Sequence, residues 1–182
     1  IRQAMQGDTP AADRLVRRQV DVLYLQYLGK QLDPALLQRI AAKENAITRT
    51  FNNYRAKVDG KELTDAQVRE VLKTSRDSQE RKAVWEASKA VGPQVEADLK
   101  ELVGLRNQAA RKLGFKDYHA MALYLGEQDQ KEVLRLFDDL DRLVREPFQA
   151  AKRSIDADLA RLSNVKPAEL RPWHYQDPFF QD

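Results

Sequence analysis

The sequence predicts an all-α fold, a multi-helix antiparallel bundle-like domain with long helices. Apolar residues recur at three- and four-residue intervals along most of the 182-residue chain, as they do in amphipathic helices. The seven glycines and seven prolines lie mostly at the ends of these periodic runs. No run alternates apolar and polar residues while being rich in β-branched side chains, so we expect no strand.

Two helices are expected before Gly60. The first begins at Thr9 and stops at Gly29, since glycine is a common helix terminator. The second begins with Asp33-Pro34, because proline is favoured in the first helical position. It ends before Gly60.

Two capping patterns mark the third and fourth helices. Thr64 and Gln67 have the spacing of a capping box, in which each side chain binds the other residue's backbone N–H. Asp77 and Glu80 repeat this spacing. We therefore expect a short helix after each pattern.

Gly92-Pro93 is the clearest break in the periodic pattern, and the proline should start the fifth helix. This helix should end at Gly114, and Asp117 should cap a short sixth helix. The break also offers a subdivision of the single helical domain 1–182 into residues 1–91 and residues 92–182.

The longest helix is expected to begin at Asp129 and to be kinked or broken at Pro147, because a proline removes a backbone hydrogen bond and clashes one turn back. Its apolar stripe comprises Val133, Leu136, Phe137, Leu140, Leu143, Val144, Phe148, Ile155, Leu159 and Leu162.

From Lys166 the chain becomes an irregular aromatic tail with three prolines. One interpretation makes it a wall of a ligand cleft or a surface that packs on another domain, because clustered aromatic side chains are costly to leave in water. The other interpretation has it fold back over the helical core. The first interpretation gives four substrate-cleft candidates: Trp173, His174, Tyr175 and Asp177.

The composition excludes several functions. The basic and acidic residues, 31 and 28 in number, are mixed along the chain, which disfavours nucleic-acid binding. No apolar run approaches the length of about 20 residues that a membrane span needs. The absence of cysteine excludes disulfides and thiolate metal sites. The chain begins with Ile1, so we expect a processed or truncated N-terminus.

No catalytic residue and no metal ligand is predicted within this chain. A helical zinc site needs two histidines one turn apart, whereas His119 and His174 lie far apart and neither precedes a glutamate. No GxSxG elbow and no glycine-rich phosphate loop occurs. The aspartates at 138, 139 and 141 lie near Arg135 and Arg142 at helical spacing, which favours a solvated face with ion pairs over a carboxylate metal cluster.

Several segments together resemble the N-terminal helical half of the angiotensin-converting-enzyme-like zinc dipeptidyl carboxypeptidases, over about residues 74–180. The related thimet-type oligopeptidases share the same general build. The segments that carry the resemblance are Thr74–Asp77, Trp85, Ala90–Pro93, Glu101–Phe115 and Leu134–Leu140, followed by the proline-led aromatic residues from Pro167.

The resemblance implies a helical fold split by a deep cleft in which short peptides are cleaved. It implies a zinc bound by two histidines of an HExxH motif and by a downstream glutamate, all beyond Asp182. The partner of this chain would be that missing C-terminal catalytic half. Residues 1–91 would then be lid-like and residues 92–182 a cleft wall, in a periplasmic or secreted enzyme without a cofactor in this chain.

The sequence departs from the family in one respect. Some members bind chloride through an arginine in the short helix that here reads Asp117–Tyr124, which contains none. A chloride-associated tyrosine of the next helix falls near Ala150. We therefore expect a divergent member. A free-standing helical binding or scaffolding domain without enzymatic activity is the alternative hypothesis.

Overall fold

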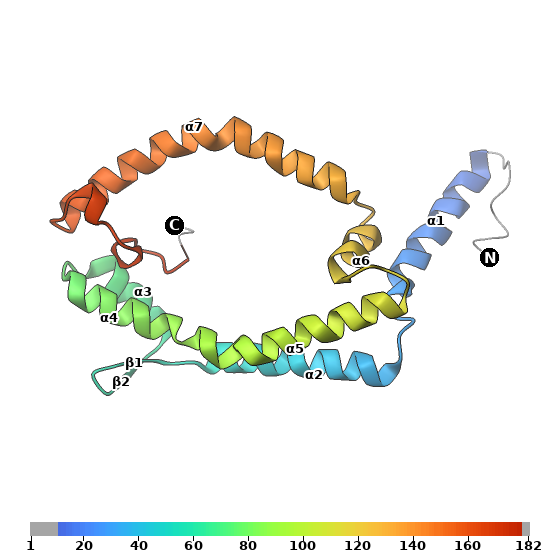
Figure 1. Ribbon diagram of the computed structural model, residues 1–182, viewed down its shortest axis with the longest axis horizontal. Coiled ribbons are helices and arrows are strands. Elements are labelled where there is room, and N and C mark those ends of the chain that lie inside the picture. The colour runs from blue at the N-terminus through green and yellow to red at the C-terminus, as the bar shows by residue number, and fades with distance from the viewer. Residues whose placement is uncertain (1–10, 180–182) are drawn as a thin grey trace. The chain divides into compact units, whose positions relative to one another are not determined.

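The computed structural model describes residues 11–179, and their side chains from residue 14 onward. Seven α-helices are present in the described residues of the chain, so the all-α prediction is confirmed (Figure 1). The predicted helix start at Thr9 lies outside the described residues. The helices are α1 Ala11–Leu28, α2 Pro34–Asn53, α3 Asp65–Thr74, α4 Ser78–Lys89, α5 Val91–Lys112, α6 Tyr118–Leu125 and α7 Gln130–Leu162, followed by the 3-10 turns η2 Pro167–Glu169 and η3 Pro172–His174.

A short hairpin interrupts the helices, so the expectation of no strand is wrong. Strands β1 (Ala56–Val58) and β2 (Lys61–Leu63) pair antiparallel. Val58 lies opposite Lys61, which leaves Asp59-Gly60 as a two-residue turn. Both turn residues have positive φ, 50° and 78°, the combination of a type I′ turn. The Asp-Gly pair was the sequence signal for this hairpin.

The chain forms two compact units, each built from two stretches of sequence. Of the described residues, the first unit comprises 11–44 and 100–138, and the second comprises 45–99 and 139–179. The subdivision at residue 92 stays a prediction.

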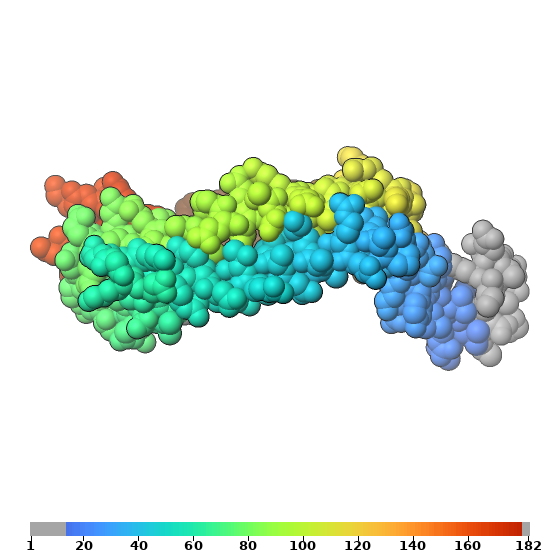
Figure 2. Space-filling view, turned by 90° about the horizontal axis from the view of Figure 1, so that it is seen from below, coloured from blue at the N-terminus to red at the C-terminus, as the bar shows by residue number. Residues whose placement is uncertain are grey.

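In the first unit, α2 lies along α5 (Figure 2). Their contact is apolar at its centre and ionic at its edge, where Lys43 binds Glu101 and Arg106 binds Glu44, over 2.7 and 2.6 Å. The buried centre consists of Leu36, Leu105 and Ala109.

The end of α5 and the start of α6 follow the predicted stop and cap. Gly114 has a φ of 86°, which suits a glycine just after a helix. The Asp117 side chain accepts the N–H of Ala120 over 2.8 Å at the start of α6. Just after α6, the carboxylate of Glu127 accepts two hydrogen bonds from the guanidinium of Arg18 on α1.

The second unit has its core between the hairpin, α3 and α4. The predicted capping box at Thr64 and Gln67 is present and starts α3. Leu72 is completely buried, and burial of a leucine side chain contributes roughly 1.5–3 kcal/mol to folding. The core consists of Ala56, Val68, Leu72 and Val84.

Helix α7 is continuous through Pro147 and is bent by 24°, so the expected kink is confirmed. The helix survives because only one N–H is lost to the proline ring while the flanking turns keep theirs. Its first turn is capped by Asp129, whose Oδ1 accepts the N–H groups of Lys131 and Glu132, each over 2.9 Å.

Candidate functional site

The aromatic tail, residues 166–179, packs on α3 and α4 of the second unit. Its described residues therefore fold back over the helical core, as the second of the two interpretations expected. Four side chains of α3 and α4, and one of α7, bind it: Arg69, Ser78, Arg81, Lys89 and Lys152.

His174 lies at the centre of this contact and is 2% exposed. Its Nδ1 accepts the backbone N–H of Arg171 over 2.8 Å, so the neutral ring carries its proton on Nε2. This Nε2–H donates to Ser78 Oγ over 2.9 Å, and the indole N–H of Trp173 donates to the same oxygen over 3.2 Å. Burial lowers the pKa of His174, and the charges of Arg81 and Arg171 lower it further.

Arg81, which is 6% exposed, binds backbone carbonyl groups of the tail through its side chain. Its guanidinium donates to the carbonyls of Trp173 and Tyr175, over 2.7 and 3.2 Å, and to the carbonyl of Ser75 over 3.1 Å. Burial and the nearby Arg76 lower its pKa. Arg81 was not among the predicted site residues. The available signal was its position one turn before Val84, on the inner stripe of α4.

Asp177 anchors the end of the described tail. It is buried, its Oδ2 accepts a hydrogen bond from Arg69, and its Oδ1 accepts the N–H of Phe179 over 2.7 Å. Beside it, Lys89 Nζ donates to the carbonyl of Pro178 over 2.7 Å and lies 4.3 Å from the centre of the Phe179 ring. Burial lowers the pKa of Lys89, although the charge of Asp177 opposes this shift.

The two aromatic candidates are half-buried. The ring of Trp173 meets that of Trp85 edge-on, with 6.3 Å between the centroids. The hydroxyl of Tyr175 donates to Asp156 of α7 over 2.8 Å and accepts from Lys152 over 2.9 Å. The four predicted residues thus belong to one docked segment, and their role as substrate-cleft residues stays a prediction.

A pocket of about 290 Å³ lies beside Phe179 in the second unit. Its wall combines aromatic rings with the cationic side chains of Arg69 and Lys89, both of which already bind groups of this chain. Arg69 binds Asp65 and Asp177, and Lys89 binds a tail carbonyl. The residues that line the pocket include Phe51, Tyr54, Arg55, Arg69, Lys89 and Phe179.

The described residues do not fit a zinc site. Both ring nitrogens of His174 are used in hydrogen bonds within the chain, so neither offers a free lone pair to a metal. His119 lies on the exposed surface of α6 in the other unit. Among the side chains that the structure describes, no three His, Asp or Glu groups come together in a metal-binding arrangement.

The aspartates of α7 form ion pairs across single helical turns, as a solvated face does. Asp139 accepts from Arg142 over 2.6 Å, and Asp141 pairs with Arg145. These pairs are exposed to solvent, which screens them, so they contribute little to stability.

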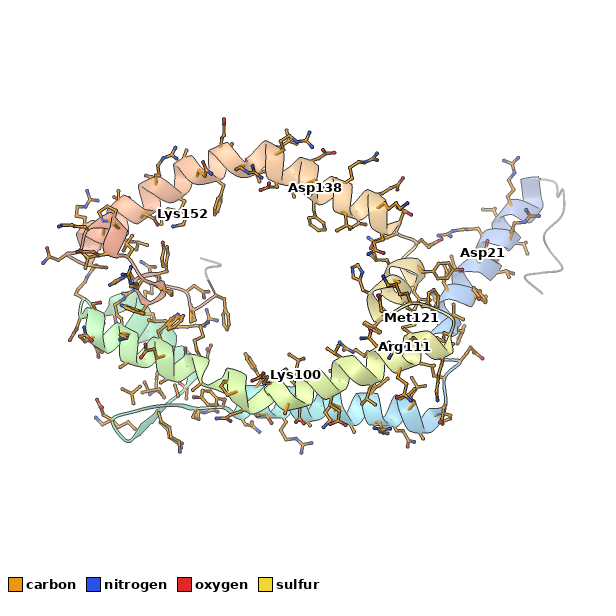
Figure 3. The ribbon with its side chains drawn as sticks, in the orientation of Figure 1. Asp21, Lys100, Arg111, Met121, Asp138 and Lys152 are labelled. Atoms are coloured by element: carbon orange, nitrogen blue, oxygen red, sulfur yellow. The ribbon has the colours of Figure 1, made fainter. Side chains whose placement is uncertain are left out.

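The part of α7 in the second unit, whose side chains are drawn in Figure 3, also exposes large apolar side chains, which we call the apolar face of α7. Leu143 is 76% exposed and Phe148 is 64% exposed. Soluble monomers rarely present a contiguous apolar surface of this kind. The face consists of Leu140, Leu143, Val144, Phe148 and Ile155.

These features define an all-α protein whose longest helix offers an apolar face and whose aromatic tail closes one helical core. The chain matches the family model described as angiotensin-converting enzyme over residues 2–149, and it belongs to that family. No curated protein and no solved structure matches the chain. The matched range ends before the aromatic tail. No helix in the described residues has the length and apolarity to cross a membrane.

Proposed function

We propose that this chain is the non-catalytic N-terminal helical portion of a zinc metallopeptidase of the peptidyl-dipeptidase type. In this proposal the enzyme hydrolyses short peptides, and the chain contributes its lid and one wall of its cleft. The observation that carries the proposal is membership of the angiotensin-converting enzyme family over residues 2–149. A periplasmic or secreted location is proposed on the same ground.

The apolar face of α7 supports the proposal. Fully burying one large apolar side chain contributes roughly 1.5–3 kcal/mol, so the partial exposure of these five forgoes a large stabilisation. A further region of the same protein is the partner we propose for this face.

The zinc of such an enzyme would be bound by that further region, because the described side chains do not fit a metal. Bound zinc supplies an activated water and polarises the scissile carbonyl. We assign no catalytic step to the side chains of this chain. Their proposed contribution is to position the peptide and to limit access of water and of long substrates.

The parent reading frame provides the first test. We expect it to encode an HExxH motif and a more distant glutamate after Asp182. The downstream region, produced together with this chain, should bind it and reduce its binding of an apolar dye. The assembled protein should cleave a short peptide in a zinc-dependent manner, whereas the 182-residue chain alone should not.

A reading frame without this motif would contradict the proposal. If the chain were also monomeric and bound no apolar dye, a free-standing helical binding or scaffolding domain would account for it better. A reading frame with the motif but no association between the two regions would contradict only the partner proposed for α7.

A further inference from the structure

His174 lies in a cationic environment, and among the side chains that the structure describes no carboxylate is hydrogen-bonded to its ring. Lys73 and Arg76 line the same small cavity as the imidazole, together with the buried Arg81. Arg171 precedes it in the tail and contacts it through its backbone N–H. A positive charge on the imidazole would therefore be repelled from several sides.

Three acidic groups of the neighbouring elements, Asp77, Glu80 and Asp177, are bound elsewhere. On α4, Asp77 caps the helix through the N–H of Gln79, and Glu80 accepts a hydrogen bond from Ser75. In the tail, Asp177 binds Arg69. The end of α7 presents only uncharged side chains to the cavity: Leu159, Leu162 and Ser163.

Protonation would also break a hydrogen bond by geometry. Nδ1 of His174 is an acceptor for the N–H of Arg171 at 2.8 Å. A protonated Nδ1 would carry its own hydrogen toward that N–H, so two donors would face each other at a distance that requires an acceptor. The turn η3 could not keep its present conformation.

We propose that the contact between the tail and α3–α4 is acid-sensitive, so that protonation of His174 releases residues 171–179 from the helices. The release would expose the indole ring of Trp173, which packs on Trp85, and would free the Arg81 guanidinium from two tail carbonyls. This proposal concerns only the second unit and does not depend on the assignment as a peptidase.

The direction in which pH changes tail docking follows from the burial that lowers the pKa of His174. The docked tail favours the neutral ring, so docking is fully favoured above the ordinary histidine pKa of about 6.5. It weakens as the pH falls below that value, by about tenfold in the docking equilibrium per pH unit, until the docked ring itself titrates.

Hydrogen exchange of the full 182-residue chain at pH 7.5 and 5.5, corrected for intrinsic exchange rates, tests the proposal. We expect the amides of residues 171–179 to lose protection at pH 5.5 while Val68 and Leu72 in the core keep theirs. His174→Asn retains an acceptor for the Arg171 N–H and cannot be protonated, so its tail should be equally protected at both pH values. His119→Asn, which changes the other histidine, should behave like the wild type.

Equal tail protection at both pH values in the wild type would overturn the proposal, and so would the same loss in His174→Asn. If His174→Asn does not fold, proton NMR of the wild type decides the matter. The titration of the His174 ring should then coincide with the shifts of the tail amides. Tail shifts that do not follow the His174 ring would also overturn it.

Discussion

The Nε–H of Arg81 donates to the backbone carbonyl of Trp173 over 2.7 Å and so joins α4 to the tail, 92 residues further along the chain. Because the same guanidinium also binds the carbonyl of Tyr175, the tail is held by its backbone as well as by its side chains. A planar guanidinium with five donors can satisfy several carbonyls at once, which a lysine ammonium cannot do in this geometry.

Arg81→Met should lower the free energy of unfolding by roughly 2–4 kcal/mol, because it leaves carbonyls of Ser75, Trp173 and Tyr175 without their donor. Urea denaturation measures this loss. Arg76→Met is the matched control, since Arg76 is exposed and its replacement should change stability by no more than about 0.5 kcal/mol. Equal effects of the two substitutions would show that the carbonyl contacts contribute little.

Leu72→Ala should cost roughly 2–5 kcal/mol, since it removes a fully buried side chain between the hairpin, α3 and α4. Thermal and urea unfolding both report it. Leu134→Ala removes the same atoms from an exposed position on α7 and should be nearly neutral. A small effect at Leu72 would mean that the core of the second unit is not packed as described.

The double variant Leu143→Glu, Phe148→Glu should reduce binding of an apolar dye and any self-association of the chain. Both side chains are exposed, so the free energy of unfolding should change little. Gln149→Glu adds a negative charge beside the face without removing apolar surface and serves as the control. Unchanged dye binding in the double variant would place the dye site elsewhere.

Pro147→Ala should straighten α7 and stabilise its central turns. Alanine restores the hydrogen bond to the carbonyl of Leu143 and is intrinsically more favourable in a helix by about 3 kcal/mol. Hydrogen exchange of the amides around residue 147 should slow, whereas Gln149→Ala should have a much smaller effect. If exchange does not slow, the 24° bend has another cause.

The ion pair of Lys152 and Asp156 should stabilise the fold only between a lower and an upper pH, each set by the pKa of one partner. Hydrogen bonds from Lys152 lower the pKa of Asp156, so its contribution is present above an ordinary pKa of about 3.9 and is lost as the pH falls through its folded value. The hydrogen bond with Asp156 raises the pKa of Lys152, so that contribution is lost only as the pH rises through its folded value.

Asp156→Asn should therefore destabilise the chain at neutral pH by at most about 1 kcal/mol and should have no effect near pH 2. Urea denaturation at the two pH values checks this difference. The exposed Asp158→Asn, whose carboxylate pairs with Arg161 at the surface, is the control. An effect that persists at pH 2 would come from the Tyr175 hydrogen bond instead.

Local signals predicted most of the fold. The caps at Thr64, Asp117 and Asp129 each act within one helical turn, so the sequence around them was sufficient. The hairpin was missed because its strands are only three residues long, too short for an alternating pattern, although Asp59-Gly60 marked the turn. At Asp77 the cap was predicted correctly, but the Glu80 side chain binds Ser75 instead of closing the box.

The candidate site was less predictable, because its contacts join residues that are far apart in sequence. Aromatic clustering drew attention to Trp173 and His174, but nothing near them indicated Ser78 or Arg81 as partners. Arginine side chains are rarely buried, so the sequence alone predicts an exposed Arg81 even though it lies one turn before Val84. Only the docked tail, which supplies carbonyl acceptors, makes its burial favourable.

The edge-on contact between Trp85 and Trp173 has an optical consequence. The chain contains two tryptophans, and both lie at this one contact. Its intrinsic fluorescence and near-ultraviolet dichroism therefore arise largely from the place where α4 meets the tail. The protein carries its own spectroscopic probe there, so detachment of the tail can be followed in real time without a chemical label.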